Sequence, residues 1–238
     1  MGCILKGGGG LNARLAVGAV LLAAGAGSRI GHRPKSLLEL GGVPLIRRQL
    51  IALSGAGVDE VVVVTGHYAD AIEAVVQDFP VTLARNMNPD DGQASSVRIG
   101  LAALSPRLDA VIVALADQPL VNAQDIGALI GAYKKRDGAA MVVPRVDGAP
   151  GNPVIFESAL RDDWLAGDVD AACRRWRDAN PGRVRWFESD NQRYCIDIDV
   201  DADLLRFTER TGHVLRWPAA FDTPRGQLAT PSLEDTAS

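Results

Sequence analysis

The segment Leu22-Ala-Ala-Gly-Ala-Gly-Ser-Arg-Ile-Gly31 follows directly on an apolar run over 17–22. An apolar run that leads into glycines is typical of a buried strand followed by a tight turn. The glycines let the backbone present its N–H groups inward, while Arg29 and the nearby Lys35 add fixed positive charge. The segment therefore predicts a turn that binds a polyphosphate; the alternative is a glycine-rich turn with two solvated basic residues.

Two nucleotide-binding motifs nearly match this segment, and each fails at one position. The dinucleotide fingerprint Gly-x-Gly-x-x-Gly requires glycine where Ile30 stands. The Walker A loop requires glycine immediately before Lys35, where Pro34 stands. A dinucleotide-dependent oxidoreductase is therefore a weaker alternative, and a P-loop is not expected.

Outside this segment, short apolar runs alternate with longer stretches of helical period, the pattern of βαβ units around a buried parallel sheet. Strands are predicted over 17–22, 60–65, 81–84, 110–115 and 140–143, and helices over 45–53, 69–77, 95–104, 123–135 and 170–179. Further strands, some of them antiparallel, are predicted over 153–156, 184–187 and 194–198. The expected fold class is α/β, Rossmann-like, with a mostly parallel central sheet.

The composition favours one folded domain. The 238 residues are 47% hydrophobic and 23% charged, which is typical of a globular protein. No linker rich in proline or glycine interrupts 13–212, so we assign this range to a single domain. Residues 1–12 are expected to form a flexible leader, and residues 213–238, which collect prolines and small polar residues, a mobile tail.

Charge and cysteine content argue against several classes of partner and site. A net charge of -4 provides no general attraction for nucleic acid or for an anionic membrane. The apolar run over 15–24 is about ten residues long, whereas a membrane span requires roughly 20. Three scattered cysteines argue against a disulfide framework and a zinc site, so we expect a cytoplasmic protein.

Carboxylates follow two further apolar segments. Asp117 stands at the end of the fourth predicted strand, where a carboxylate can hold Mg²⁺ over phosphates; alternatively, it caps a helix or shapes the turn before Pro119. Further along, Asp197, Asp199 and Asp201 stand at every second position, which places them on one face of a short predicted strand. The alternative is that two of the three are structural, for instance capping the helix that follows. We expect Asp199 to be the second metal ligand, with Asp197 as its substitute.

Several short motifs share one order along the chain: Leu22-Ala-Ala-Gly-x-Gly-x-Arg29 with Lys35, Gly41-Gly-Val-Pro-Leu45, Gly92 with Ser95-Ser-Val-Arg98, Asp117-Gln-Pro119, Gly151-Asn-Pro153 and Asp197-Ile-Asp199. In these motifs the chain resembles nucleotidyltransferases of the molybdenum cofactor cytidylyltransferase type, within the wider group that includes sugar-phosphate and methylerythritol-phosphate nucleotidyltransferases. The resemblance covers about 17–205. It implies a single-domain, three-layer α/β/α nucleotidyltransferase fold.

The resemblance also implies an activity, the Mg²⁺-dependent transfer of CMP from CTP to the phosphate of molybdopterin with release of pyrophosphate. Catalysis would rest on Lys35, Arg29 and Asp117, and the metal on Asp117 and Asp199. The residues implied in nucleotide binding are Leu22, Ala23, Ala24, Gly25, Gly27, Ser28, Arg29, Lys35, Gly92 and Ser96, and those implied in binding the acceptor are Gly151, Asn152 and Pro153. A molybdoenzyme or its chaperone would receive the product.

The expected choice of base rests on Leu22-Ala-Ala-Gly25 together with Ser95-Ser96: Ser96 and the backbone near Gly92 would tell cytosine from uracil, and Ala24 would limit the size of the base. The alternative is that Ala24 merely packs under the strand. Related enzymes of the cytidylyl branch carry Ala-Ala at the position of Ala23-Ala24, whereas the guanylyl branch carries glycine, so the Cβ of Ala24 is expected to admit cytosine and obstruct guanine. Two other functions stay open: a nucleotidyltransferase for a sugar or polyol phosphate, and a non-catalytic nucleotide-binding chaperone of the cofactor.

Overall fold

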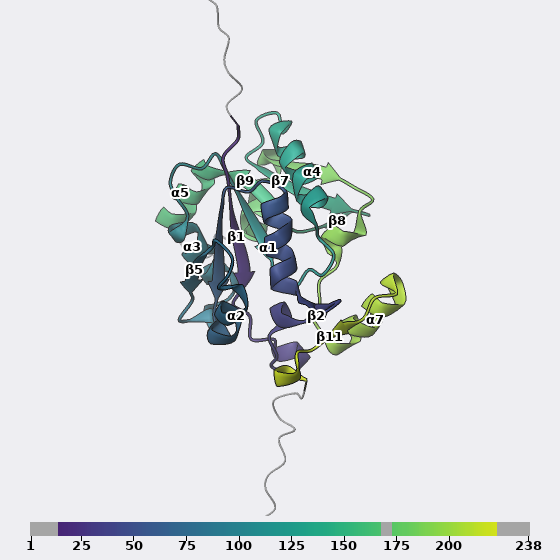
Figure 1. Ribbon diagram of the computed structural model, residues 1–238. Helices are drawn as coiled ribbons and strands as arrows, with labels where there is room; N and C mark the ends of the chain where they lie inside the picture. Colours follow the sequence, from purple (N-terminus) through teal and green to yellow (C-terminus); the bar gives the residue numbers. More distant parts are fainter. Residues whose placement is uncertain (1–13, 168–172, 223–238) are drawn as a thin grey trace, which may run out of the picture.

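The computed structural model describes residues 14–167 and 173–222, which build one large sheet, a small sheet and the helices around them (Figure 1). The strands of the large sheet are β1 (Val17–Ala23), β4 (Glu60–Thr65), β5 (Thr82–Arg85), β6 (Ala110–Leu115), β7 (Met141–Val146), β8 (Ala149–Pro150), β9 (Val154–Glu157) and β10 (Val184–Glu188). Their order is β10-β7-β9-β6-β1-β4-β5, with β8 beside β7. Only β9 runs antiparallel to its neighbours on this path, so the predicted mostly parallel sheet is confirmed.

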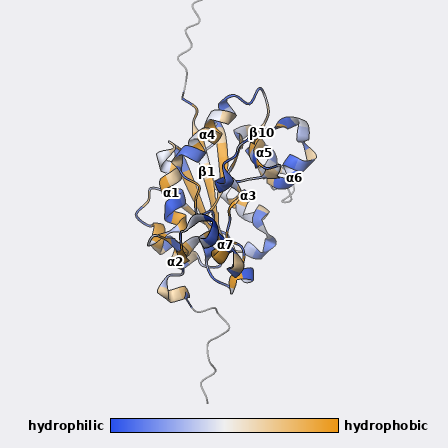
Figure 2. Cartoon of the chain, turned by 90° about the vertical axis from the view of Figure 1, so that its right-hand side faces the viewer, coloured by the Kyte–Doolittle hydropathy of each residue, from blue (hydrophilic) through white to orange (hydrophobic). Residues whose placement is uncertain are grey.

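Helices cover both faces of the sheet. They are α1 (Leu45–Gly55), α2 (Ala69–Val76), α3 (Gln93–Ala103), α4 (Ala123–Lys134), α5 (Ser158–Ala166), α6 (Cys173–Ala179) and α7 (Asp201–Thr211). Along β1 the side chains alternate, so Ala19 and Leu21 pack under α1, α2 and α4, while Val20 and Leu22 pack under α3, α5 and α6. Figure 1 shows α1 and α4 on one side of β1 and α3 and α5 on the other. The expected three-layer arrangement is confirmed, and Figure 2 shows the central strands in hydrophobic colour.

A third apolar cluster lies beside the large sheet. The strands β2 (Glu39–Leu40), β3 (Val43–Pro44) and β11 (Leu215–Arg216) form a three-stranded sheet with the order β11-β2-β3. Its members Leu40 and Leu215 pack with Phe207 of α7. Part of the tail expected over 213–238 is therefore folded against the domain, whereas the leader over 1–12 and residues 223–238 lie outside the described residues.

One arginine joins this small cluster to the loop after β1. Arg33 is buried, and its Nη2 donates to Asp201 Oδ1 at 2.7 Å. Its guanidinium carbon lies 4.2 Å from the centre of the Trp217 ring, a distance typical of a cation–π contact. The folded part of the expected tail thus holds the loop that carries the first candidate site.

The strand predicted over 194–198 is wrong. Residues Gln192–Cys195 form a 3-10 helix, and no described strand contains Asp197. Tyr194 is buried instead, and its hydroxyl donates to the backbone oxygen of Asp125 at 2.8 Å, so this segment packs against α4. The proposed common strand face is lost as well, since Asp201 begins α7 and pairs with Arg33.

Most other predicted elements are confirmed to within a few residues. Two helices were not predicted, α5 and α7, and the latter buries only Phe207 among its residues, too little for an apolar period. The helix predicted over 170–179 is observed from Cys173, and residues 168–172 lie outside the described part. Among the described residues, no helix is long and apolar enough to cross a membrane.

Candidate active site

The candidate site lies at the edge where the parallel strands β1 and β6 end. Leu22 is paired with Leu115 in the sheet, so the loop after β1 and the loop that carries Asp117 leave the sheet side by side. The reversed strand β9 adds its beginning to the same edge, because Val154 is paired with Val113 near the end of β6. The segment around Asn152, which the resemblance implies in acceptor binding, is thereby brought to the loops that follow β1 and β6.

A cavity of about 550 Å³ opens at this edge. The predicted residues that line it are Leu22, Ala23, Ala24, Gly25, Arg29, Lys35, Gly92, Ser96, Asp117 and Asp199. Lining residues without a role in the sequence-based prediction are Ser36, Pro89, Gln93, Leu115, Ala116 and Arg174, together with Asp197, the alternative ligand. We call this space the nucleotide cavity.

Two residues predicted to bind the nucleotide do not line this cavity. Gly27 adopts a φ of 60°, and a Cβ there would lie 2.0 Å from the backbone oxygen of Arg33, so the position requires glycine for the turn itself. Ser28 lines a separate depression beside His67 and Tyr68.

The charged side chains of the nucleotide cavity pair with one another. Lys35 Nζ lies 2.6 Å from Asp117 Oδ2 and 2.8 Å from Asp199 Oδ1, and Arg29 Nη2 lies 3.0 Å from Asp199 Oδ2. Burial lowers the pKa of Lys35, but attraction to and hydrogen bonds with the two aspartates outweigh it, so the net shift is upward. For Asp199, burial raises the pKa, but hydrogen bonds and attraction from Lys35 and Arg29 bring it below its usual value.

Asp197 completes a group of acidic side chains at this cavity. Burial raises its pKa, and repulsion by Asp117 and Asp199 raises it further. No group of three or more His, Cys, Asp or Glu side chains in 14–167 and 173–222 has the geometry to hold a metal ion by itself. Asp117 and Asp199 nevertheless fit Mg²⁺, which commonly takes one or two carboxylates and completes its shell with phosphate oxygens and water.

Gln118, next to Asp117, forms hydrogen bonds with three segments that are distant in the sequence. Its Nε2 donates to the backbone oxygens of Tyr194 at 3.0 Å and of Asn152 at 3.3 Å, and its own backbone oxygen accepts from Gln49 Nε2 at 2.6 Å. The residue is 2% exposed. The sequence placed Gln118 in a motif without giving it a role, because its partners are backbone atoms of distant segments.

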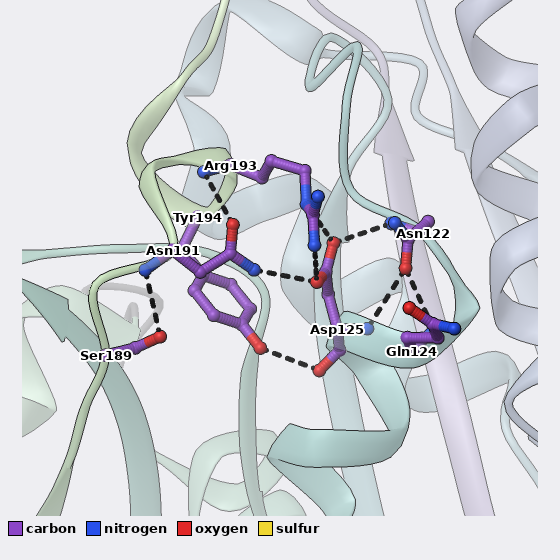
Figure 3. A network of polar contacts seen from close by, with 7 residues as sticks. All are labelled: Asn122, Gln124, Asp125, Ser189, Asn191, Arg193 and Tyr194. Carbon is purple, nitrogen blue, oxygen red and sulfur yellow. Dashed lines mark hydrogen bonds and ion pairs between the residues drawn. The ribbon is translucent and has the colours of Figure 1, made fainter.

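A network around the buried Asp125 fixes the segment that leads into Asp197 and Asp199 (Figure 3). Asp125, near the start of α4, accepts from Arg193 Nη2 at 2.7 Å and Nε at 2.9 Å, and from Asn191 Nδ2 at 2.7 Å. The backbone N–H of Asn122 donates to the same carboxylate at 3.1 Å, completing a capping box. The carboxylate thereby joins α4 to the loop behind the metal-binding candidates.

The beginning of α3 forms another wall of the cavity. Gly92 precedes the helix, and Ser96 faces the cavity from its first turns. Asn86, which was not predicted, is buried and donates through Nδ2 to Ser95 Oγ at 2.8 Å and to Ser96 Oγ at 3.0 Å. Because Ser96 Oγ accepts this bond, its own hydrogen can be donated to a ligand.

A second cavity, of about 360 Å³, adjoins the first, and we call it the acceptor cavity. Gly151 and Asn152, two of the three residues implied in acceptor binding, line it, while Pro153 is buried and does not. A Cβ on Gly151 would lie 2.8 Å from the Cβ and the backbone oxygen of Tyr194, so glycine permits this close approach. Gln93, Leu115 and Arg174 line both cavities.

Comparison with known proteins identifies both related sequences and similar structures. Nicotine blue oxidoreductase from Paenarthrobacter nicotinovorans is 29% identical over 193 residues, 79% of this chain and 94% of that protein. Bifunctional protein GlmU from Kineococcus radiotolerans is 34% identical over 146 residues, 60% of this chain and 29% of GlmU, so the chain spans less than a third of that relative. A nucleotidyl transferase structure from Methanothermobacter thermautotroptrophicus has a TM-score of 0.68 and 27% identity, covering 82% of this chain and 97% of that one.

A protein-family model shows to which family the chain belongs. The model described as the MobA-like NTP transferase domain matches residues 19–184, which include β1, the loop after it and Asp117. The chain belongs to the MobA-like NTP transferase family and is an enzyme of the nucleotidyltransferase type.

Proposed function

We propose that the protein transfers CMP from CTP to the phosphate of molybdopterin, depends on Mg²⁺ and releases pyrophosphate. The observation that carries this proposal is the set formed by Lys35, Asp117 and Asp199, in which one cation bridges two carboxylates within 2.8 Å. When a triphosphate binds with a divalent cation, new contacts would replace these ion pairs: phosphate oxygens would bind Lys35, and the two carboxylates would bind the metal.

In the proposed reaction an oxygen of the acceptor phosphate attacks the α-phosphorus of CTP. The new P–O bond forms as the bond from the α-phosphorus to the β-phosphate oxygen breaks, and the electron pair leaves with pyrophosphate. Arg29 and Lys35 hold the triphosphate and neutralise the charge that develops on the leaving group. A phosphate monoester is largely dianionic near neutral pH, so no side chain needs to act as general base.

The proposed metal ligands are Asp117 and Asp199. Bound there, Mg²⁺ would supply charge neutralisation and orientation of the phosphates. Gln118 and the network around Asp125 support the two carboxylates by fixing the loops on which they stand.

The preference for cytosine is proposed from Ala24 and Ser96. Ala24 lines the cavity and is buried, so its methyl group limits the space for a base. Ser96, held by Asn86, offers a hydroxyl that can discriminate the polar edge of a pyrimidine.

The proposed acceptor is molybdopterin, bound at the acceptor cavity beside Gly151 and Asn152. A molybdoenzyme or its chaperone would take up the product, and we place the protein in the cytoplasm. The cysteines Cys173 and Cys195 are both free, in keeping with a reducing compartment.

The second candidate function is that of an oxidoreductase. It is suggested by nicotine blue oxidoreductase, because the match to this chain covers 94% of that relative. The paired charges of the nucleotide cavity and the altered dinucleotide fingerprint favour nucleotidyl transfer instead.

Pyrophosphate release tests the proposal directly. The purified chain is supplied with Mg²⁺ and with CTP, GTP, ATP or UTP, with and without molybdopterin, and the pterin product is identified by mass spectrometry. We expect fastest release with CTP and only when molybdopterin is present. Equal rates with GTP would refute the base assignment, and a sugar phosphate that replaced molybdopterin would refute the acceptor. Nucleotide binding without turnover would point to a chaperone, and consumption of NAD(P)H without pyrophosphate release to an oxidoreductase.

A further inference from the structure

The acceptor cavity combines an apolar wall with basic residues at its mouth. Its wall is made of side chains from α3, β6, β7 and β9: Val97, Val113, Leu115, Met141, Val143 and Val154. Arg174 and Arg177 reach it from α6. A ligand that matches such a surface has an apolar body and an anionic end.

The two arginines differ in their existing contacts. Arg177 pairs with Asp178 at 2.8 Å and lies 5.8 Å from the centre of the Trp186 ring. Arg174 is exposed and makes no hydrogen bond or ion pair with any residue of the described part of the chain. The pKa of Asp178 is lowered first by its hydrogen bond with Arg177 and then also by the charge of Arg174. Within 14–167 and 173–222, no hydrogen bond has to break before the Arg174 guanidinium binds a ligand.

The position of Arg174 matches what the transfer requires. The attacking phosphate must lie against the α-phosphate, so it must occupy the junction between the two cavities. Arg174 lines both cavities, whereas Lys35 and Arg29 line the nucleotide cavity and pair with its carboxylates. A guanidinium at the junction offsets the repulsion between the two phosphates and can bind one of them through two parallel hydrogen bonds.

We propose that Arg174 binds the phosphate of the acceptor and that the apolar wall of the acceptor cavity selects a phosphate ester with a flat ring system, whose face packs on that wall, over a polyol phosphate. This inference rests on the proposed function and deepens it by naming the substrate class and the residue that holds it. Polyol hydroxyls placed against Val113, Met141 and Val143 would lose their hydrogen bonds to water and gain few in return.

Calorimetry on the full chain tests this inference without turnover. Phenyl phosphate and glycerol 3-phosphate are titrated into the protein, alone and with Mg²⁺ and a non-hydrolysable CTP analogue. We expect phenyl phosphate to bind at least about tenfold tighter than glycerol 3-phosphate, because only its ring matches the wall. Arg174→Gln should weaken the binding of phenyl phosphate by about tenfold or more, since one charge-assisted contact is lost. The affinity for the CTP analogue should stay within about twofold of the unaltered protein.

Two further variants serve as controls. Arg174→Lys, which keeps the charge, should recover part of the lost affinity, whereas Arg210→Gln, on the exposed end of α7, should bind both esters like the unaltered protein. Equal binding of glycerol 3-phosphate would overturn the substrate class, and unchanged binding by Arg174→Gln would overturn the role of Arg174. If the CTP analogue failed to bind while phenyl phosphate still required Arg174, the proposed function would fail and the phosphate site would stand.

Discussion

The nucleotide cavity and the acceptor cavity adjoin each other, yet they are built from different parts of the elements. The nucleotide cavity takes charged residues from the loops that follow strands, such as Lys35 and Asp117, and pairs them. The acceptor cavity takes apolar side chains such as Val113 and Val143 from the strands themselves, with arginines from α6. Phosphate chemistry requires particular residue types at fixed places, whereas an apolar wall requires shape. The residues of the first cavity can therefore be recognised as sequence motifs, whereas the apolar wall and the arginines of the second cavity are brought together only by the fold.

The largest effect is expected when the carboxylate of Asp117 in the nucleotide cavity is removed. Asp117→Asn keeps the shape of the side chain but weakens the proposed metal site, so the rate of CMP transfer should fall by about 10² to 10³. Steady-state kinetics at saturating Mg²⁺ measures the loss, and binding of phenyl phosphate should be unaffected. Near-normal turnover would remove Asp117 from the reaction.

Within the nucleotide cavity, Lys35 and Arg29 should differ in how much each contributes to stability. The side chain of Lys35 is 19% exposed and bridges two carboxylates, so Lys35→Ala should cost stability, about 1 to 3 kcal/mol, besides cutting turnover by about 10². Arg29 is 67% exposed, so Arg29→Ala should weaken nucleotide binding and leave stability nearly unchanged. Urea unfolding and calorimetry measure both quantities. If Arg29→Ala lost as much stability as Lys35→Ala, the difference in their roles would be refuted.

The network around Asp125 should support both cavities from behind. Asp125→Ala leaves Arg193 and Asn191 without their common acceptor, so the free energy of unfolding should fall by about 2 kcal/mol. Asp78→Ala, which removes the partner of Arg47 at the surface, is the matched control and should barely change the urea midpoint. Equal effects of the two variants would show that the network around Asp125 stabilises the fold no more than an exposed ion pair does.

The smallest expected effect concerns the base. Ala24→Gly removes the methyl group at the nucleotide cavity, so the preference for CTP over GTP should narrow by about tenfold. Ala26→Gly, in the same loop but not lining this cavity, controls for added backbone freedom. Competition between the two nucleotides measures the ratio, and an unchanged preference in Ala24→Gly would assign Ala24 to packing alone.

The sequence predicted the central strands and the charged half of the site because both leave local signals. Continuous apolar runs mark the buried strands, and Lys35 and Asp117 stand in recognisable contexts after them. The rest depends on contacts between distant segments. Gln118 and Asn86 act through partners that only the fold brings near, and Tyr194 overrides a strand-like pattern by turning into the core. Arg174 lies on a short polar helix without any motif.

The late position of Asp199 in the chain has a consequence for synthesis on the ribosome. All strands of the large sheet are complete at Glu188, whereas Asp197 and Asp199 follow and are held by contacts to α4 and the loop after β1. Domains fold as the chain emerges from its N-terminus. A product terminated near 190 would therefore contain every strand of the large sheet but only one of the two carboxylates that flank Lys35, so a premature stop removes half of the proposed metal site.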